Sequence, residues 1–193
     1  MRIASVLALL VFTFAGCAGG GGANTYRVRL DTTKGPVVVD VDRSLAPNGA
    51  KRFYDLVQAH YFTGSRFYRV VPEFVVQWGS AADPAVSKKW DVTIPDDPVK
   101  LSNTRGTIAF AASSAPNSRT THMFINLNDN SRLDAMGFAA LGRVVSGMNA
   151  VDAIYSGYGE KPDQGQIAAK GNAYLEKTFP RLDYIKSATI VTQ

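Results

Sequence analysis

The stretch Phe67-Tyr68-Arg69-Val70-Val71-Pro72-Glu73-Phe74-Val75-Val76-Gln77 decides the fold of this chain. Two runs rich in β-branched and aromatic residues flank Pro72-Glu73, so the stretch predicts two short strands joined by a turn. Strict alternation along the first strand places Arg69 on one face together with Phe67 and Val71. On these residues alone, the simplest interpretation of Arg69 is a solvent-exposed arginine on a strand that is otherwise apolar.

In the second run, unless a bulge intervenes, alternation puts Phe74 and Val76 on one face, and Val75 and Gln77 on the other. The same strand signals recur on both sides of this pair. Further strands are expected over residues 26–30, 36–42, 107–111, 122–127, 139–144 and 187–192.

Apolar residues spaced three and four apart predict an amphipathic helix over residues 47–59, which begins at Pro47. A second helix is expected over residues 148–154 and a short third one over residues 172–178, while residues 81–102 are expected to form a polar loop. Many short strands with few helices predict a mainly β domain, a closed barrel whose ends are covered by helices.

The composition fits one globular domain with a substantial core, since 46% of the 193 residues are hydrophobic and 19% are charged. The net charge is +5, but the charges are spread along the chain and the longest basic run is Lys88-Lys89. Nucleic-acid recognition usually needs a clustered basic stripe. We therefore expect a mildly basic surface and no nucleic-acid partner.

Several kinds of catalytic site have no support in the sequence. The chain has two histidines and one cysteine, which is too few for a zinc-type ligand cluster. Neither a phosphate-binding G-x-x-x-x-G-K-[ST] loop nor a G-x-S-x-G nucleophile motif occurs. We expect chemistry without a metal, a cofactor or a covalent intermediate.

The first residues predict targeting rather than fold. Met1-Arg2 precedes an apolar run over residues 3–14, which ends at Phe14-Ala15-Gly16-Cys17. That ending resembles the lipobox of bacterial lipoproteins, although Phe14 stands where leucine is usual. The alternatives are a free thiol in the tail of an ordinary signal peptide, or a buried thiol, and the glycine run over residues 19–22 argues against burial.

We expect a lipoprotein signal peptide over residues 1–16, a lipidated Cys17 with a Gly-rich tether over residues 17–25, and a folded domain over residues 26–193. Such a protein would be held at a membrane of the bacterial cell envelope by its N-terminal lipid. The domain would face the periplasm or the cell exterior.

Three blocks, in this order, resemble the cyclophilin-type peptidyl-prolyl isomerases. The first is Arg69-Val70-Val71-Pro72-x-Phe74-x-x-Gln77. The second comprises residues 106–111, Pro116-Asn117-Ser118 and residues 122–127, and the third comprises residues 132–134 and 137–144. The resemblance extends from about Tyr26 to the C-terminus, with a tail like that of a bacterial branch of the family.

The resemblance implies a closed, antiparallel, eight-stranded barrel capped by two helices, and an enzyme that accelerates rotation about X-Pro bonds. Arg69, Phe74 and Gln77 would be catalytic, with Arg69 as the donor that favours the twisted amide and Gln77 orienting it. The substrate-binding residues would be Val75, Ala111, Ala112, His122, Phe124, Leu133 and Phe138. The partners would be proline-containing polypeptides, bound by a monomer.

Three positions depart from the commonest family pattern. Ala112 replaces a frequent asparagine, His122 a frequent glutamine, and Arg132 a frequent tryptophan. Two other functions are therefore considered. The groove could retain proline-containing peptides with little turnover, as a chaperone or scaffold module, or the chain could be a lipocalin-like barrel for a small apolar ligand. The order of the three blocks favours the enzyme.

Overall fold

The computed structural model describes residues 24–191. The predicted signal peptide and the predicted lipidation site at Cys17 therefore lie outside the described residues. The first strand begins at Thr25, one residue inside the stretch predicted as a tether. Within residues 24–191, no helix is long and apolar enough to cross a membrane.

The described part contains eight strands and five α-helices. The strands are β1 (Thr25–Thr32), β2 (Gly35–Asp42), β3 (Arg69–Val71), β4 (Val75–Trp78), β5 (Thr107–Phe110), β6 (Met123–Asn126), β7 (Ala140–Ser146) and β8 (Ile185–Val191). The helices are α1 (Pro47–Gln58), α2 (Pro84–Trp90), α3 (Met148–Asp152), α4 (Gln164–Lys170) and α5 (Asn172–Thr178), and a 3₁₀ turn, η1, covers Ser131–Leu133.

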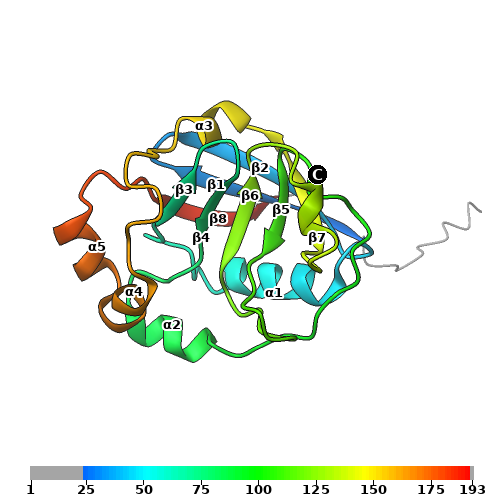
Figure 1. The fold of residues 1–193 in the computed structure, drawn as a ribbon, viewed down its shortest axis with the longest axis horizontal. Coiled ribbons are helices and arrows are strands. Elements are labelled where there is room, and N and C mark those ends of the chain that lie inside the picture. Colours follow the sequence, from blue (N-terminus) through cyan, green and yellow to red (C-terminus); the bar gives the residue numbers. More distant parts are fainter. Residues whose placement is uncertain (1–23, 192–193) are drawn as a thin grey trace, which may run out of the picture.

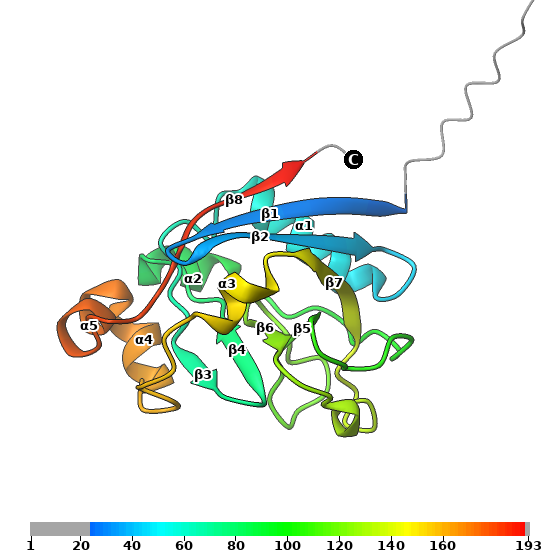
Figure 2. The same ribbon diagram turned by 90° about the horizontal axis from the view of Figure 1, so that it is seen from above.

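All eight strands belong to one antiparallel sheet with the order β3-β4-β6-β5-β7-β2-β1-β8. The sheet curls so that β8, β1 and β2 form one side and β3 to β6 the other (Figure 2). The main hydrophobic core fills the inside of the curl and includes Leu30, Phe53, Trp78 and Leu141. This confirms the prediction of a mainly β domain.

The prediction of a closed barrel is wrong, because the edge strands β3 and β8 do not pair along their length. The two edges meet only through an isolated bridge between Arg66 and Tyr184 and through neighbouring backbone hydrogen bonds. Regular pairing stops here because residues 65–68 leave the strand conformation, and the amide of Val70 donates instead to the carbonyl of Gly159. The sheet is therefore an open, strongly curled half-barrel.

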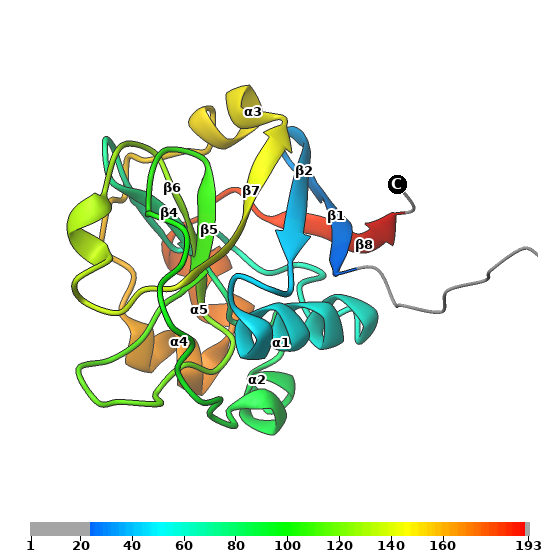
Figure 3. The ribbon, with the colours of Figure 1, turned by 90° about the vertical axis from the view of Figure 1, so that its right-hand side faces the viewer.

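The two predicted capping helices are confirmed at opposite ends of the curl. Figure 1 and Figure 3 show α1 below the sheet and α3 above it. Helix α1 begins at Pro47, as expected, and the amides of Asn48 and Gly49 donate to the carboxylate of Asp97. That carboxylate satisfies amides that have no partner inside the helix.

Two further helices, α2 and α4, were not expected from the sequence. Each has seven residues, too few to show a clear apolar period, and α2 lies within the predicted polar loop. Each begins after an aspartate, Asp83 or Asp163, whose side chain accepts a hydrogen bond from a backbone amide of the first turn. Helices α4 and α5 lie outside the curl (Figure 2) and contribute to a second hydrophobic cluster that includes Tyr68, Ile167 and Phe179.

Candidate active site

A row of four side chains crosses the outer face of the sheet. Arg69 on β3 pairs with Gln77 on β4, Gln77 pairs with Phe124 on β6, and Phe124 pairs with Ala109 on β5. Residues directly opposite one another in an antiparallel sheet point to the same face. Residues far apart in sequence are thus brought to one surface by strand register alone.

Phe74 joins this outer surface, which corrects the prediction that it shares a face with Val76. Val76 is in the main core, whereas Phe74 packs on an outer cluster formed by Val75, Ala109, Phe124 and Leu133. The alternation is lost because Phe74 precedes β4, just after Glu73, whose φ of 59° turns the backbone.

The first strand is corrected in the same way. Phe67 is buried in the main core and Tyr68 in the second cluster, because both precede β3 in irregular backbone. Phe67 therefore does not share the outer face with Arg69.

A groove of about 420 Å³ lies on the outer face. The ten predicted catalytic and substrate-binding residues all line it: Arg69, Phe74, Val75, Gln77, Ala111, Ala112, His122, Phe124, Leu133 and Phe138. Four lining residues were not predicted, namely Ser113, Ser118, Thr120 and Gln164. Ser118 belongs to the predicted second block, and Ser113 and Thr120 lie between its parts, but Gln164 belongs to α4, which was itself missed.

Arg69 is fixed from two sides. Its Nη1 donates to Oε1 of Gln77 at 3.0 Å, while its Nε and Nη2 each lie 2.6 Å from Oε1 of Glu160. The guanidinium carbon also lies 5.4 Å from the centre of the Phe74 ring, within cation–π range. Glu160 was missed because it comes from the loop between α3 and α4, where no local pattern marks it.

Gln77 continues into a buried polar chain. Its Nε2 donates to the hydroxyl of Tyr68 at 2.8 Å, and that hydroxyl lies 2.7 Å from Nδ1 of His122. Burial raises the pKa of the Tyr68 phenol. Burial also lowers the pKa of the His122 imidazole, against a weaker opposing effect of Asp91. Both side chains are therefore held neutral.

The floor of the groove is apolar and rests on a polar scaffold. Phe124 and Phe138 meet edge to face at 5.8 Å between ring centres. Behind them, the side-chain amide of Asn130 donates to the carbonyl of Phe74 at 2.8 Å and to Asn126 at 2.8 Å. The segment that carries Phe74 is therefore held by side chains outside its own strand pair.

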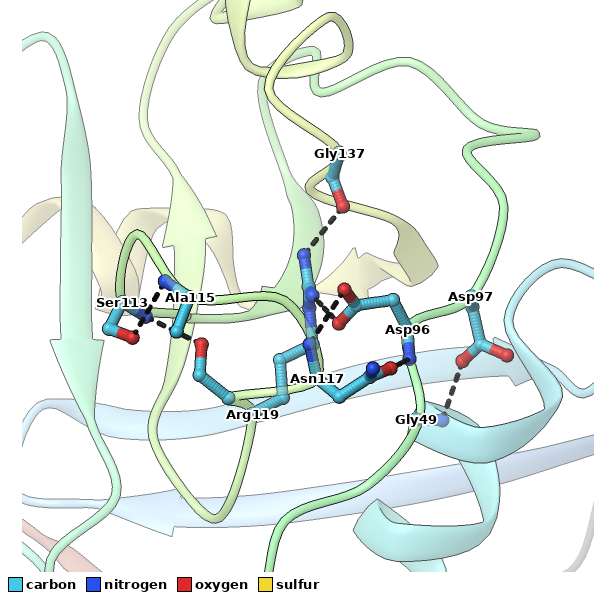
Figure 4. A network of polar contacts seen from close by, with 9 residues as sticks. Gly49, Asp96, Asp97, Ser113, Ala115, Asn117, Arg119 and Gly137 are labelled. Atoms are coloured by element: carbon cyan, nitrogen blue, oxygen red, sulfur yellow. Dashed lines mark hydrogen bonds and ion pairs between the residues drawn. The ribbon is translucent and has the colours of Figure 1, made fainter.

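A clamp formed by Arg119, Asp96 and Gly137 holds one rim of the groove (Figure 4). Arg119, with 8% of its side chain exposed, pairs with Asp96 and donates to the carbonyl of Gly137. The guanidinium carbon of Arg119 lies 5.7 Å from the centre of the Phe138 ring. Because the neighbouring Asp97 caps α1 through Gly49, the clamp connects the groove rim to a capping helix.

The chain is similar to known proteins of one family. The family model for "Cyclophilin type peptidyl-prolyl cis-trans isomerase/CLD" matches residues 27–171. A peptidyl-prolyl cis-trans isomerase from Acinetobacter baylyi is 36% identical over 68% of this chain and 72% of its own length. Peptidyl-prolyl cis-trans isomerase A from Dickeya dadantii is 34% identical over 79% of this chain and 82% of its own.

Solved structures show the same fold. A cyclophilin-type isomerase from Cryptosporidium parvum superposes with a TM-score of 0.67 at 20% identity, covering 88% of this chain and 99% of that protein. A cyclophilin from Hirschia baltica superposes with a TM-score of 0.66 at 18% identity, covering 85% and 73%. The chain is therefore a member of the cyclophilin-type peptidyl-prolyl cis-trans isomerases.

Proposed function

We propose that this isomerase accelerates rotation about X-Pro bonds of extracytoplasmic polypeptides, with Arg69 as the hydrogen-bond donor to the twisted amide. The observation that carries this proposal is the row Arg69–Gln77–Phe124, which sets a fixed cation beside an apolar floor. The Cryptosporidium parvum relative has also been crystallised in the presence of the dipeptide Ala-Pro. A proline ring on the apolar floor would bring its own carbonyl toward the guanidinium.

Rotation about an X-Pro bond needs correctly placed donors and an apolar surface, and no nucleophile. Amide resonance makes the barrier to rotation about 18–20 kcal/mol. A charge-assisted hydrogen bond contributes about 1.5–3 kcal/mol, which corresponds to roughly a ten- to hundredfold rate gain. Arg69 can supply that share by approaching the proline nitrogen and carbonyl as the bond twists, and preorganised dipoles of the groove supply the rest.

Arg69 keeps free donors for this role. A guanidinium has five N–H donors. Three are used, one toward Gln77 and two toward Glu160, which leaves one N–H on each terminal nitrogen for a substrate. Gln77 is buried, with 7% of its surface exposed, and its side-chain oxygen accepts from Arg69.

The Glu160 contact also supports the second candidate, a proline-peptide-binding chaperone or scaffold with little turnover. A carboxylate 2.6 Å from Arg69 competes with the substrate carbonyl for the same cation. In the isomerase the ion pair with Glu160 orients Arg69. In a binding module it would weaken the hydrogen bond from Arg69 to the substrate carbonyl.

The two candidates are separated by measuring exchange and binding on one sample. A protein that spans residues 24–193 is mixed with a capped Ala-Pro peptide, and cis–trans exchange is followed by NMR beside a peptide titration. The proposal predicts exchange well above the buffer rate at concentrations where the peptide binds. Saturable binding with exchange at the buffer rate would leave only the binding module.

We further propose that Cys17 carries a lipid that holds the domain at a membrane of the bacterial cell envelope. The sequence Phe14-Ala15-Gly16-Cys17 supports this, and the placement of β1 is compatible with it. β1 begins on the side of the molecule away from α4 and α5 (Figure 2). Labelling cells with a radioactive fatty acid tests the anchor: label should enter the wild-type protein and be absent from Cys17→Ser.

A further inference from the structure

A continuous chain of hydrogen bonds runs from His122 through Tyr68 and Gln77 to Arg69. The three links measure 2.7, 2.8 and 3.0 Å. Each inner member is buried: Tyr68 is 1% exposed and Gln77 7% exposed. Water is therefore a poor substitute for any partner in the chain, and each donor must meet an acceptor within it.

The direction of every link follows from Arg69. Arginine has donors only, so Gln77 must turn its carbonyl oxygen to Arg69 and its amide nitrogen to Tyr68. The Tyr68 hydroxyl accepts from that nitrogen and has one proton left, which it donates to Nδ1 of His122. His122 is then neutral, with its own proton on Nε2.

A second proton on His122 conflicts with this order. Protonated Nδ1 becomes a donor and turns toward the Tyr68 hydroxyl, whose proton then loses its acceptor. The chain recovers an acceptor only if Gln77 rotates its amide, which would bring the NH₂ group against the guanidinium of Arg69. Without that rotation a buried hydroxyl proton has no acceptor, which is costly, and with it the hydrogen bond between Gln77 and Arg69 is lost.

We propose that Tyr68 and His122 are positioning residues for Arg69, and that protonation of His122 switches isomerisation down by reversing this chain. The inference rests on the proposed role of Arg69. Family members often have a glutamine at the position of His122, and a glutamine cannot titrate. The switch is therefore a property of this chain's own residues.

The surroundings of His122 favour the neutral ring at neutral pH. On the groove side it faces Tyr68 and, through Gln77, the cation Arg69. On the other side it lines a second cavity of about 400 Å³ with Lys88 and Asp91 of the α2 region. Burial lowers the pKa of His122 and outweighs the opposing pull of Asp91, so the switch should act below about pH 6.5.

The test is the pH dependence of kcat/KM, in which the value for each variant at acid pH is compared with the value for the same variant at neutral pH. Exchange of a capped Ala-Pro peptide is measured by NMR between about pH 5 and pH 8. We expect the wild-type kcat/KM to fall by about tenfold toward acid pH, as one hydrogen bond to Arg69 is lost. His122→Gln keeps an acceptor for Tyr68 and should have no acid limb, and Tyr68→Phe should also be flat.

Glu160 is the other titratable partner of Arg69, so Glu160→Gln serves as the matched control. This variant should retain the acid limb of the wild type. An acid limb that persists in His122→Gln, or that disappears only in Glu160→Gln, overturns the proposal.

A readout independent of activity is the ¹⁵N spectrum of the His122 ring. The proposal predicts a proton on Nε2 and none on Nδ1 at neutral pH, and the opposite tautomer would contradict it. The Arg69 Nε resonance should follow the His122 titration in the wild type and lose that response in Tyr68→Phe. If the wild type shows no exchange at any pH while these spectra agree, the proposed function fails and the hydrogen-bond chain stands.

Discussion

Arg69 on β3 lies directly across the strand pair from Gln77 on β4, and its Nη1 donates to the side-chain oxygen Oε1 of Gln77 at 3.0 Å. The pairing is fixed by backbone register, so it does not depend on a flexible loop. On the far side of Gln77, Phe124 continues the same row as the floor of the groove. The guanidinium and the apolar surface therefore keep a constant relation to each other.

The clamp formed by Arg119, Asp96 and Gly137 should contribute measurably to the free energy of unfolding. Asp96→Asn leaves the buried guanidinium of Arg119 without its carboxylate, and we expect a loss of about 2 kcal/mol, reduced from a fully buried pair because Asp96 is partly exposed. KM should rise as well, since Arg119 also holds the loop before Phe138. Urea unfolding and peptide exchange measure the two effects.

The matched control is the surface pair of Lys51 and Asp55 on α1, where 72% of the lysine side chain is exposed. Lys51→Gln should cost less than about 0.5 kcal/mol and leave KM unchanged. Equal losses for the two variants would show that burial of Arg119 is not what makes the clamp matter.

Gly79 should tolerate no side chain. Its φ is +135°, and an added Cβ would come within 2.3 Å of the Cα of His122. We expect Gly79→Ala to cost about 3 kcal/mol or more, from backbone strain and overpacking together. At Gly137 φ is +80°, but an added Cβ would meet no atom within 4 Å. Gly137→Ala therefore tests backbone strain without a clash and should cost about 1 kcal/mol. Chemical denaturation of both variants decides, and similar losses would contradict the predicted clash.

Alkaline pH should destabilise the fold through Tyr26. Burial raises the pKa of its phenol, whose hydroxyl donates to the carbonyl of Ala50 at 2.5 Å. The native chain keeps the proton while the unfolded chain loses it near pH 10, so this contribution is present below about pH 10 and is lost as pH rises above it.

Each such group adds a slope of about 1.4 kcal/mol per pH unit above that point. Tyr26→Phe should therefore show a shallower loss of stability with pH than the wild type, although it is less stable at neutral pH. The free energy of unfolding, measured by denaturant at several pH values, gives the slope. An unchanged slope in Tyr26→Phe would refute this assignment.

Local pattern was enough to predict most of the strands and the two capping helices, whereas the ten predicted residues of the groove came from the resemblance to the family. The spacing of apolar residues, two apart in a strand and three or four apart in a helix, can be seen among neighbouring residues, as at β2 and α1. Where the backbone leaves the regular pattern, the prediction failed: the turn at Glu73 moved Phe74 to the groove face, and irregular residues before β3 left the sheet open.

Long-range contacts were the other limit. Tyr68 and His122 are 54 residues apart, and Arg69 and Glu160 are 91 apart. No spacing rule joins such positions: the first contact depends on how residues before β3 pack against residues before β6, and the second on how the loop after α3 returns to β3. The hydrogen-bond chain behind Arg69 could therefore be found only in the folded structure.

The role of Arg69 as donor is tested most directly by the rate of Ala-Pro exchange catalysed by Arg69→Ala, measured beside the affinity for the same peptide. We predict that kcat/KM falls by roughly ten- to hundredfold while the fold is retained, and that peptide affinity changes much less. Arg69→Lys should recover little of the rate, because an ammonium lacks the planar fork that reaches Gln77 and the substrate together. A rate for Arg69→Ala equal to that of the wild type would contradict the account.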